Sequence, residues 1–256
     1  MLIEYARGNS VELGFDRRLH AYRVGDKVIP SATKVLGVIS KPALIPWALK
    51  SGATWLENNL FYDDTSSSNG QGIFHTKGLG LDALVKGMKS AYRTKSGDAI
   101  NIGNITHDWL EAAIKWKLGN GDPPDMPTNE GAQKSIAGFR SWLEENEVEW
   151  HSSEEKVYHR KYGYAGTADA VATVNGEFCV VDWKTSKAIY PEHHLQVAAY
   201  AKAIETMYGK SIDATYILRC DKNTGGFQVG RSTEIEENFK AFLGALTLYK
   251  RLKELR

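Results

Sequence analysis

The sequence predicts an α/β protein, because strand-like and helix-like patterns both occur in one chain of 256 residues. The strand-like patterns gather in the second half, where the apolar runs between Glu149 and Trp183 are typical of three strands. A helical pattern over Glu192–Tyr208, rich in alanine, is followed by a strand over Ala214–Cys220 and by a final helix from about Glu234. We therefore expect the order β-β-β-α-β-α in the second half, with helices in front of it.

The first half is expected to be mostly helical. Two short strands are predicted within Leu19–Pro30, and Ser31 is predicted to cap a short helix after them. A longer helix with Pro46 in its first turn should follow. Three amphipathic patterns predict further helices over Leu79–Tyr92, Asn104–Lys117 and Asn129–Glu145.

The composition is that of an ordinary globular protein, with 42% hydrophobic and 25% charged residues. The net charge is +1, so any DNA-binding surface must come from local clustering of charge. No run approaches the roughly 18 apolar residues of a membrane span. The start, MLIEYARGNS, lacks the pattern of a secretory signal. We therefore expect a cytoplasmic protein, intracellular and not secreted, with no membrane partner.

The chain has two cysteines, Cys179 and Cys220, and both lie in apolar, strand-like runs. Four thiolates would be needed for a structural zinc site of the all-cysteine type or for an iron–sulfur cluster. The sequence therefore argues against a disulfide framework and predicts no iron–sulfur cluster.

The dipeptide Asn175-Gly176 gives the most specific local prediction. Asn-Gly between two strand-like runs is typical of a two-residue hairpin turn, because both turn positions need positive φ. Counting outward from this turn places Asp169 directly opposite Asp182. Lys184 lies two residues beyond Asp182 and therefore projects from the same face of the strand. The sequence thus predicts two carboxylates and an ammonium group that converge on one spot.

Two facing carboxylates repel each other unless they share a proton or a cation. Carboxylate oxygens are hard ligands that suit Mg²⁺ or Mn²⁺, and a bound metal ion can activate water and stabilise charge on a phosphate. The alternative is an exposed hairpin face with ordinary ion pairs. The neighbours of the charged residues argue against it, since both faces of the hairpin are apolar and a buried charge is costly.

Four motifs resemble those of the PD-(D/E)XK nucleases, and most closely the RecB-like exonuclease branch, to which phage exonucleases and mitochondrial genome maintenance exonucleases belong. The motifs are Gly103–His107, Gly166–Asp169, Asp182–Thr185 and Gln196–Tyr200. The resemblance covers roughly Ile102 to Ala203, and Pro30–Trp47 is similar to the N-terminal part of some members. It implies a restriction-endonuclease-like core with a small mixed sheet flanked by helices. It also implies a core over 102–256 and an N-terminal hairpin and helical wall or arch over 1–101, in a single structural unit overall.

The resemblance implies a role for each matching residue. The metal ligands would be His107, Asp169, Asp182 and the backbone carbonyl of Trp183, and Lys184 would be the catalytic lysine. Gln196 and Tyr200 would brace the site or touch the DNA backbone, although they also fit a plain polar stripe on a helix. A glutamate on the first strand would help the site; Glu154 is our choice over Glu155, and two solvated strand-end charges are the alternative. For His107, a histidine without function on an amphipathic helix is the alternative.

DNA is the expected partner, with hydrolysis of its phosphodiester bonds in replication, recombination or repair as the expected reaction. In this branch of the family, exonucleolytic attack on single-stranded or frayed ends is the expected mode, and the motifs suggest a phage or mobile-element origin. Lys86, Lys89 and Arg93 recur at helical spacing and form either a phosphate-contacting stripe or a solvated helix face. Trp47 is a candidate for base stacking. A site-specific endonuclease and a non-catalytic DNA-binding or recombination partner remain as alternatives.

Overall fold

The computed structural model describes residues 1–6, 8, 10–16, 21–63 and 73–255. The chain forms two compact units: a core unit of Met1–Ile39 with Ile102–Arg256, and a second unit of Ser40–Asn101. The predicted division into 1–101 and 102–256 stays a prediction. Among the helices that the structure describes, none is long and apolar enough to cross a membrane.

A five-stranded sheet forms the centre of the core unit, with the strand order β12-β11-β10-β9-β8. β10 and β11 are parallel, and the other neighbours are antiparallel. The strands are β8 (Val148–His159), β9 (Tyr164–Val174), β10 (Glu177–Lys184), β11 (Ala214–Cys220) and β12 (Phe227–Ser232). The first four were predicted. The sequence analysis missed β12, which lies at the sheet edge, is mostly exposed or half-buried, and so lacks an apolar pattern.

The hairpin of β9 and β10 has the predicted register, from Glu177 opposite Val174 to Val181 opposite Ala170. Its turn is the predicted Asn175-Gly176, and both residues have positive φ, 50° and 85°. The next residues in this register are Asp182 and Asp169. The Asn-Gly turn therefore fixes the alignment of the two strands that carry the site.

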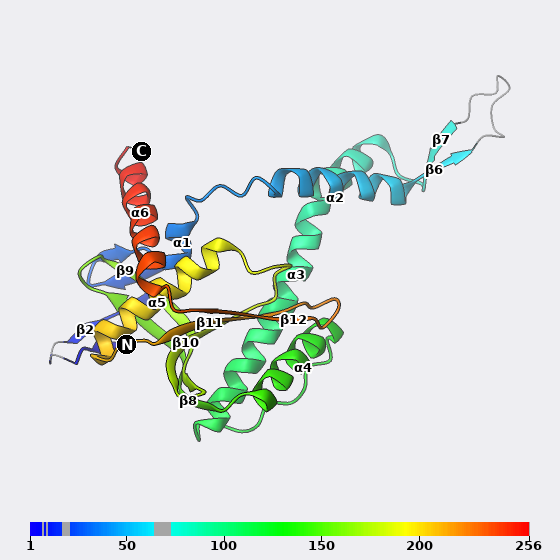
Figure 1. Cartoon of the computed structure of the whole chain (residues 1–256). Helices are drawn as coiled ribbons and strands as arrows, with labels where there is room; N and C mark the ends of the chain where they lie inside the picture. The colour runs from blue at the N-terminus through cyan, green and yellow to red at the C-terminus, as the bar shows by residue number, and fades with distance from the viewer. Residues whose placement is uncertain (7, 9, 17–20, 64–72, 256) are drawn as a thin grey trace. The chain divides into compact units, whose positions relative to one another are not determined.

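Helices cover both faces of the sheet, as Figure 1 shows for α5 and α6 on one side and α4 on the other. On the first side, α5 (Pro191–Tyr208), α6 (Ile235–Glu254) and the short α1 (Ala32–Leu36) pack in one apolar cluster with Val171 and Val180 of the hairpin. On the second side, α4 (Glu130–Glu145) packs with Ala172, Val181 and the end of α3 in another cluster. The hairpin is buried on both faces, as predicted, and the α/β prediction is confirmed.

The helix α3 (Leu81–Lys117) corrects one prediction. We expected two helices, over Leu79–Tyr92 and Asn104–Lys117, but the structure has one helix of 37 residues. The joining segment, TKSGDAINIG, has no apolar periodicity and contains two glycines, each of which costs about 1 kcal/mol in a helix interior. The sequence of this segment therefore does not predict a helix. In the structure, the helical segments on both sides extend through it and join. Residues 81–101 belong to the second unit and 102–117 to the core unit.

The second unit consists of α2 (Leu44–Asn59), the hairpin of β6 (Leu60–Asp63) and β7 (Ile73–Thr76), and the first part of α3. Pro46 lies in the first turn of α2, as predicted. Gly87 of α3 allows close packing against Trp55 of α2, since a Cβ at Gly87 would lie 2.1 Å from the indole. Trp47 meets Tyr92 edge-on at 6.4 Å between ring centroids. The two helices are therefore held together by aromatic contacts.

Two small sheets precede α1 in the core unit. They are the pair β1 (Leu2–Glu4) and β2 (Ser10–Glu12), and the three-stranded sheet of β3 (Gly14–Asp16), β4 (Ala21–Val24) and β5 (Lys27–Ile29). The predicted hairpin of Leu19–Pro30 corresponds to β4 and β5, whereas residues 19 and 20 lie outside the described part of the chain. Ser31 caps α1 as predicted, because its Oγ accepts a hydrogen bond of 3.1 Å from the Lys34 N–H.

Candidate functional site

A cavity of about 1000 Å³ in the core unit brings together most of the predicted site residues. It lies where β8, β9 and β10 meet the end of α3, the start of α5 and the N-terminal strands. The predicted residues in its lining are His107, Glu154, Asp169, Asp182, Lys184, Gln196 and Tyr200. Trp183 is buried in the apolar cluster beneath the sheet instead. Lys86, Lys89, Arg93 and Trp47 belong to the second unit, where the first three are exposed.

Three carboxylates lie in one row across β8, β9 and β10. Asp182 follows Val181 in the register of the hairpin and so comes opposite Asp169. On the other side of β9, Ser153 pairs with Ala170 and Glu155 with Ala168, which places Glu154 opposite Asp169. Asp169 is 9% exposed and Asp182 only 1% exposed. Such a row of buried negative charge is unfavourable unless cations balance it.

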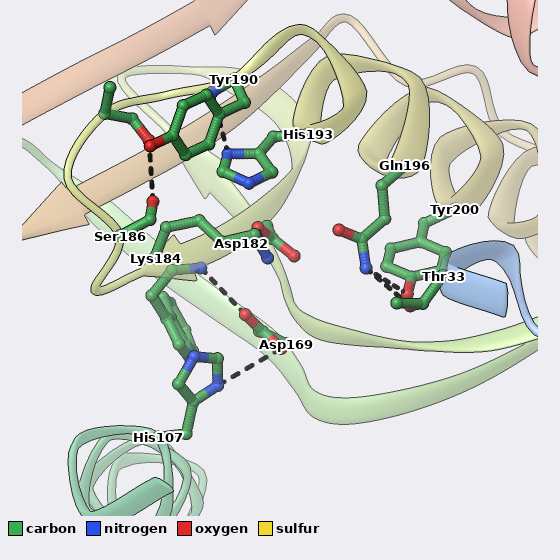
Figure 2. A network of polar contacts seen from close by, with 12 residues as sticks. Thr33, His107, Asp169, Asp182, Lys184, Ser186, Tyr190, His193, Gln196 and Tyr200 are labelled. Atoms are coloured by element: carbon green, nitrogen blue, oxygen red, sulfur yellow. Dashed lines mark hydrogen bonds and ion pairs between the residues drawn. The ribbon is translucent and has the colours of Figure 1, made fainter. Parts of the chain in front are cut away.

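Asp169 is held by two neighbours. Its Oδ2 accepts a hydrogen bond of 2.9 Å from the backbone N–H of Trp183, and its Oδ1 lies 3.8 Å from Nδ1 of His107. Figure 2 shows His107 pointing from α3 toward the carboxylates. The approach of α3 depends on Gly103, because a Cβ there would lie 3.0 Å from Oγ1 of Thr185. The glycine and the histidine of the predicted Gly103–His107 motif therefore place one helix against the end of β10.

Lys184 forms a buried ion pair with Oδ2 of Asp182. Burial raises the pKa of Asp182, the Lys184 ammonium opposes this, and the charge of Asp169 adds to it. For Lys184, burial acts to lower the pKa, but the two aspartates outweigh it and the pKa rises. The lysine is therefore held as a cation beside two carboxylates.

Glu154 has an unusual backbone conformation for a strand residue. Its φ is +52°, in the left-handed region that non-glycine residues seldom adopt. Burial and, after it, the charge of Asp169 raise its pKa to about 7. Glu155 does not line the cavity and lies instead near Tyr208, whose pKa is raised to about 12 by burial first and then by the charge of Glu155. The structure thus places Glu154 in the cavity, and its role stays a prediction.

Gln196 and Tyr200 of α5 form one side of the cavity, one helical turn apart. Gln196 Nε2 donates to the Tyr200 hydroxyl at 2.8 Å and lies 3.1 Å from Oγ1 of Thr33 (Figure 2). The Tyr200 ring packs over Gly166, where a Cβ would lie only 2.3 Å from the ring. Burial and the charge of Asp182 raise the pKa of Tyr200, so its hydroxyl stays protonated. The glycine of the Gly166–Asp169 motif and the tyrosine of the Gln196–Tyr200 motif therefore form one packing unit.

The chemistry of these donors fits a divalent cation. Carboxylates suit a hard ion, and Asp169 and Asp182 are two nearly buried carboxylates close enough for the charge of Asp169 to raise the pKa of Asp182. As the side chains lie, no group of three or more His, Cys, Asp and Glu residues within the described ranges is close enough together to ligate one ion. Cys179 and Cys220 are free and buried in β10 and β11. The residues that could hold a cation are thus Asp169 and Asp182, with His107 and Glu154 beside them.

Several cavity residues come from parts of the sequence that we did not connect with the site. They are Met1, Leu13, Gly14, Phe15, Tyr22, Ser31, Thr33 and Lys34 in the N-terminal segment, and Lys156 on β8. The N-terminal hairpin was predicted, but its packing against β9 is a long-range contact that leaves no local signal. Lys156 lies two residues beyond Glu154, and this spacing could have found it.

Comparison with known proteins gives one family and several partial relatives. The family model described as PD-(D/E)XK nuclease superfamily matches residues 74–252. A stretch of 73 residues, 25% of this chain, is 36% identical to "Mitochondrial genome maintenance exonuclease 1" of Homo sapiens and covers 21% of that protein. The Xenopus tropicalis protein of the same name is 41% identical over 59 residues, 21% of this chain and 17% of that protein. The chain thus matches about a fifth of the length of these relatives.

Among solved structures, an alkaline exonuclease from Laribacter hongkongensis, LHK-Exo, has a TM-score of 0.29 at 14% identity, over 57% of this chain and 82% of that chain. Its complex with dAMP has a TM-score of 0.29 at 16% identity, over 57% of this chain and 83% of that chain. TM-scores this low carry no inference about the site.

Proposed function

The chain belongs to the PD-(D/E)XK nuclease superfamily, and from this premise we propose that it is a metal-dependent DNA exonuclease that acts on single-stranded or frayed ends. One observation carries the proposal: Asp169 and Asp182 directly follow the last paired residues of the hairpin, both are nearly buried, and Lys184 forms an ion pair with Asp182. DNA binding alone does not require two facing buried carboxylates. Hydrolysis of a phosphodiester assisted by a cation gives such carboxylates a use, since they can bind the cation.

Asp169 and Asp182 are the proposed ligands of Mg²⁺ or Mn²⁺, with His107 as a further ligand or as a support for Asp169. The backbone carbonyl of Trp183 stays a proposal of the same kind. A divalent cation bound here would lower the pKa of the attacking water and neutralise charge on the phosphate. An imidazole in the set favours Mn²⁺ over Mg²⁺.

Lys184 is proposed to stabilise the negative charge that builds up on the phosphate during attack. Its ion pair with Asp182 supports this electrostatic role, because the ammonium is held beside the carboxylate that is proposed to bind the cation. Gln196 and Tyr200 are proposed to brace this side of the site through the bond between them and the packing of Tyr200 on Gly166. Glu154 is proposed to complete the acidic row.

Lys86, Lys89 and Arg93 are proposed to contact the DNA backbone, and Trp47 to stack on a base. The three cations are exposed on successive turns of α3, and Trp47 is half-buried against Tyr92 in the same unit. A partner protein in replication or recombination, an intracellular location and a phage origin remain further proposals.

Digestion of labelled DNA tests the function. Purified protein is incubated with single-stranded DNA labelled at the 5′ or the 3′ end, with the same DNA blocked at both ends, and with closed circular DNA, each with Mg²⁺, Mn²⁺ or EDTA. We expect short products from open ends, none in EDTA, and strong inhibition by blocked ends. Nicking of the closed circle would identify an endonuclease instead. DNA binding without any product would support the non-catalytic alternative.

A further inference from the structure

The N-terminal segment forms a wall of the cavity that lies outside the residues matched by the family model, 74–252. This N-terminal wall consists of Leu13, Gly14, Phe15, Tyr22, Ser31, Thr33 and Lys34. It is tied to the strand that carries Asp169. The Ala165 N–H donates to Pro30 O at 3.0 Å, and the hydroxyls of Tyr22 and Thr167 share a hydrogen bond of 2.7 Å. The wall is therefore positioned by the same strand as the acidic row.

Phe15 is the aromatic side chain that the wall exposes. It pairs with Tyr22 across β3 and β4, and the two rings are tilted by 56° with centroids 5.0 Å apart. Tyr22 is only 6% exposed, whereas Phe15 is 37% exposed and lines the cavity. A phenylalanine ring held at a fixed angle beside a polar cavity provides a flat apolar surface. Such a surface stacks well on a nucleobase, because every base has a π-face.

Two lysines line the same cavity as this ring, and neither forms an ion pair with a residue in the described ranges. Lys34 is exposed at α1, and Lys156 is half-buried on β8, where it pairs with Thr167. Both line the cavity that contains the acidic row. Lysines that face a cavity without a carboxylate partner are available to bind an anion such as a backbone phosphate. The wall thus combines a stacking surface with cations.

Resting on the nuclease function proposed above, we propose that the N-terminal wall is the subsite for a nucleotide next to the scissile phosphate. Phe15 stacks on its base, and Lys34 and Lys156 bind its phosphate oxygens. The cavity, at about 1000 Å³, has the size of a ligand pocket that encloses a nucleotide-sized group. Stacking does not distinguish among the four bases, so the subsite accepts any sequence.

A cycle that combines a protein variant with a modified substrate tests the subsite. Wild type and Phe15→Ala are compared on single-stranded oligonucleotides that each carry one abasic nucleotide, moved stepwise along the strand. We expect Phe15→Ala to raise KM about tenfold on intact DNA, the size of one lost stack. At one abasic position, the KM of wild type should rise by the same factor, and the KM of Phe15→Ala should not rise further. Lys34→Ala and Lys156→Ala should weaken binding and reduce its dependence on salt.

Val28→Ala is the matched control. Val28 is 41% exposed on the same three-stranded sheet but pairs with Arg23, one residue along from Tyr22, so it lies on the opposite face. It should leave KM unchanged. The subsite proposal would be wrong if, at every abasic position, the increase in KM caused by Phe15→Ala multiplied the increase caused by the abasic nucleotide. The nuclease function would still stand in that case, because wild type cleaves the DNA. If wild type cleaves no DNA, the nuclease proposal fails, and the dissociation constants of the same proteins and oligonucleotides are measured by fluorescence anisotropy. The subsite is supported if the two losses of affinity do not multiply at one abasic position, and is overturned if they multiply at every position.

Discussion

Replacing Lys184 by alanine is expected to reduce DNA cleavage by about a thousandfold, the typical effect of removing a group that stabilises charge in the transition state. The ammonium lies on Asp182 and has a side chain only 18% exposed, so its removal leaves this buried carboxylate without its ion-pair partner. Its loss also raises the pKa of Asp182 further, because the largest attraction that opposes burial is gone. Single-turnover cleavage at saturating protein measures the effect directly.

Lys240→Ala is the control for this substitution. Lys240 is a lysine on α6 whose side chain is 60% exposed and pairs with Glu237. Cleavage by this variant should stay within about twofold of wild type, since exposed ion pairs contribute little. Circular dichroism and the unfolding midpoint show whether each variant is folded. A folded Lys184→Ala protein that cleaves at the wild-type rate would place the reaction at another site.

Replacing Gly166 by alanine is expected to destabilise the core unit by about 2 kcal/mol, the usual cost of forcing a methyl group into a packed core. The new Cβ would lie 2.3 Å from the Tyr200 ring, which is 3% exposed and has no room to move away. Cleavage should fall as well, because the same strand carries Asp169 three residues later. Urea unfolding measures the stability, and cleavage is measured on protein that remains folded.

Two further variants show whether the collision with Tyr200 is the cause. Gly166→Ala combined with Tyr200→Ala should cost less stability than the sum of the two single variants, because the clash is absent without the ring. Gly244→Ala is the same substitution at an exposed position of α6, where nothing lies within 4 Å of the new Cβ. It should stabilise the protein by roughly 0.5–1 kcal/mol through helix propensity. Additive losses in the double variant would contradict the packing account.

The alignment of the strands that carry Asp169 and Asp182 could be predicted from sequence because it depends on a local feature. The Asn175-Gly176 turn fixes the register of a hairpin, and a register fixes every pair along it. The position of Lys184 on the same face as Asp182 followed from the two-residue period of a strand. The restriction-endonuclease-like fold followed from the resemblance, and the match to the family model confirms it.

The features that sequence reasoning missed depend on long-range packing or on backbone strain. The contact of Tyr22 with Thr167 joins residues 145 apart and leaves no periodic signal. We chose Glu154 over Glu155, and Glu154 is the one that lines the cavity, but the bulge near Trp150 and the positive φ of Glu154 do not show in the residue pattern. The helix α3 likewise continues through Gly97 and Gly103 because the helical segments on both sides extend through them. Local rules therefore predict the centre of the site but not its walls.

The binding of Mn²⁺ by wild type and by Asp169→Asn tests the central claim most directly. Asp169 lies in the middle of the acidic row, and asparagine can still accept the Trp183 N–H bond, so the fold should be kept. An electron paramagnetic resonance titration follows the free ion. We predict that wild type binds Mn²⁺ and that Asp169→Asn binds it at least tenfold more weakly, with loss of cleavage. Equal Mn²⁺ binding by both proteins, or none by wild type, would contradict a metal centre at these carboxylates.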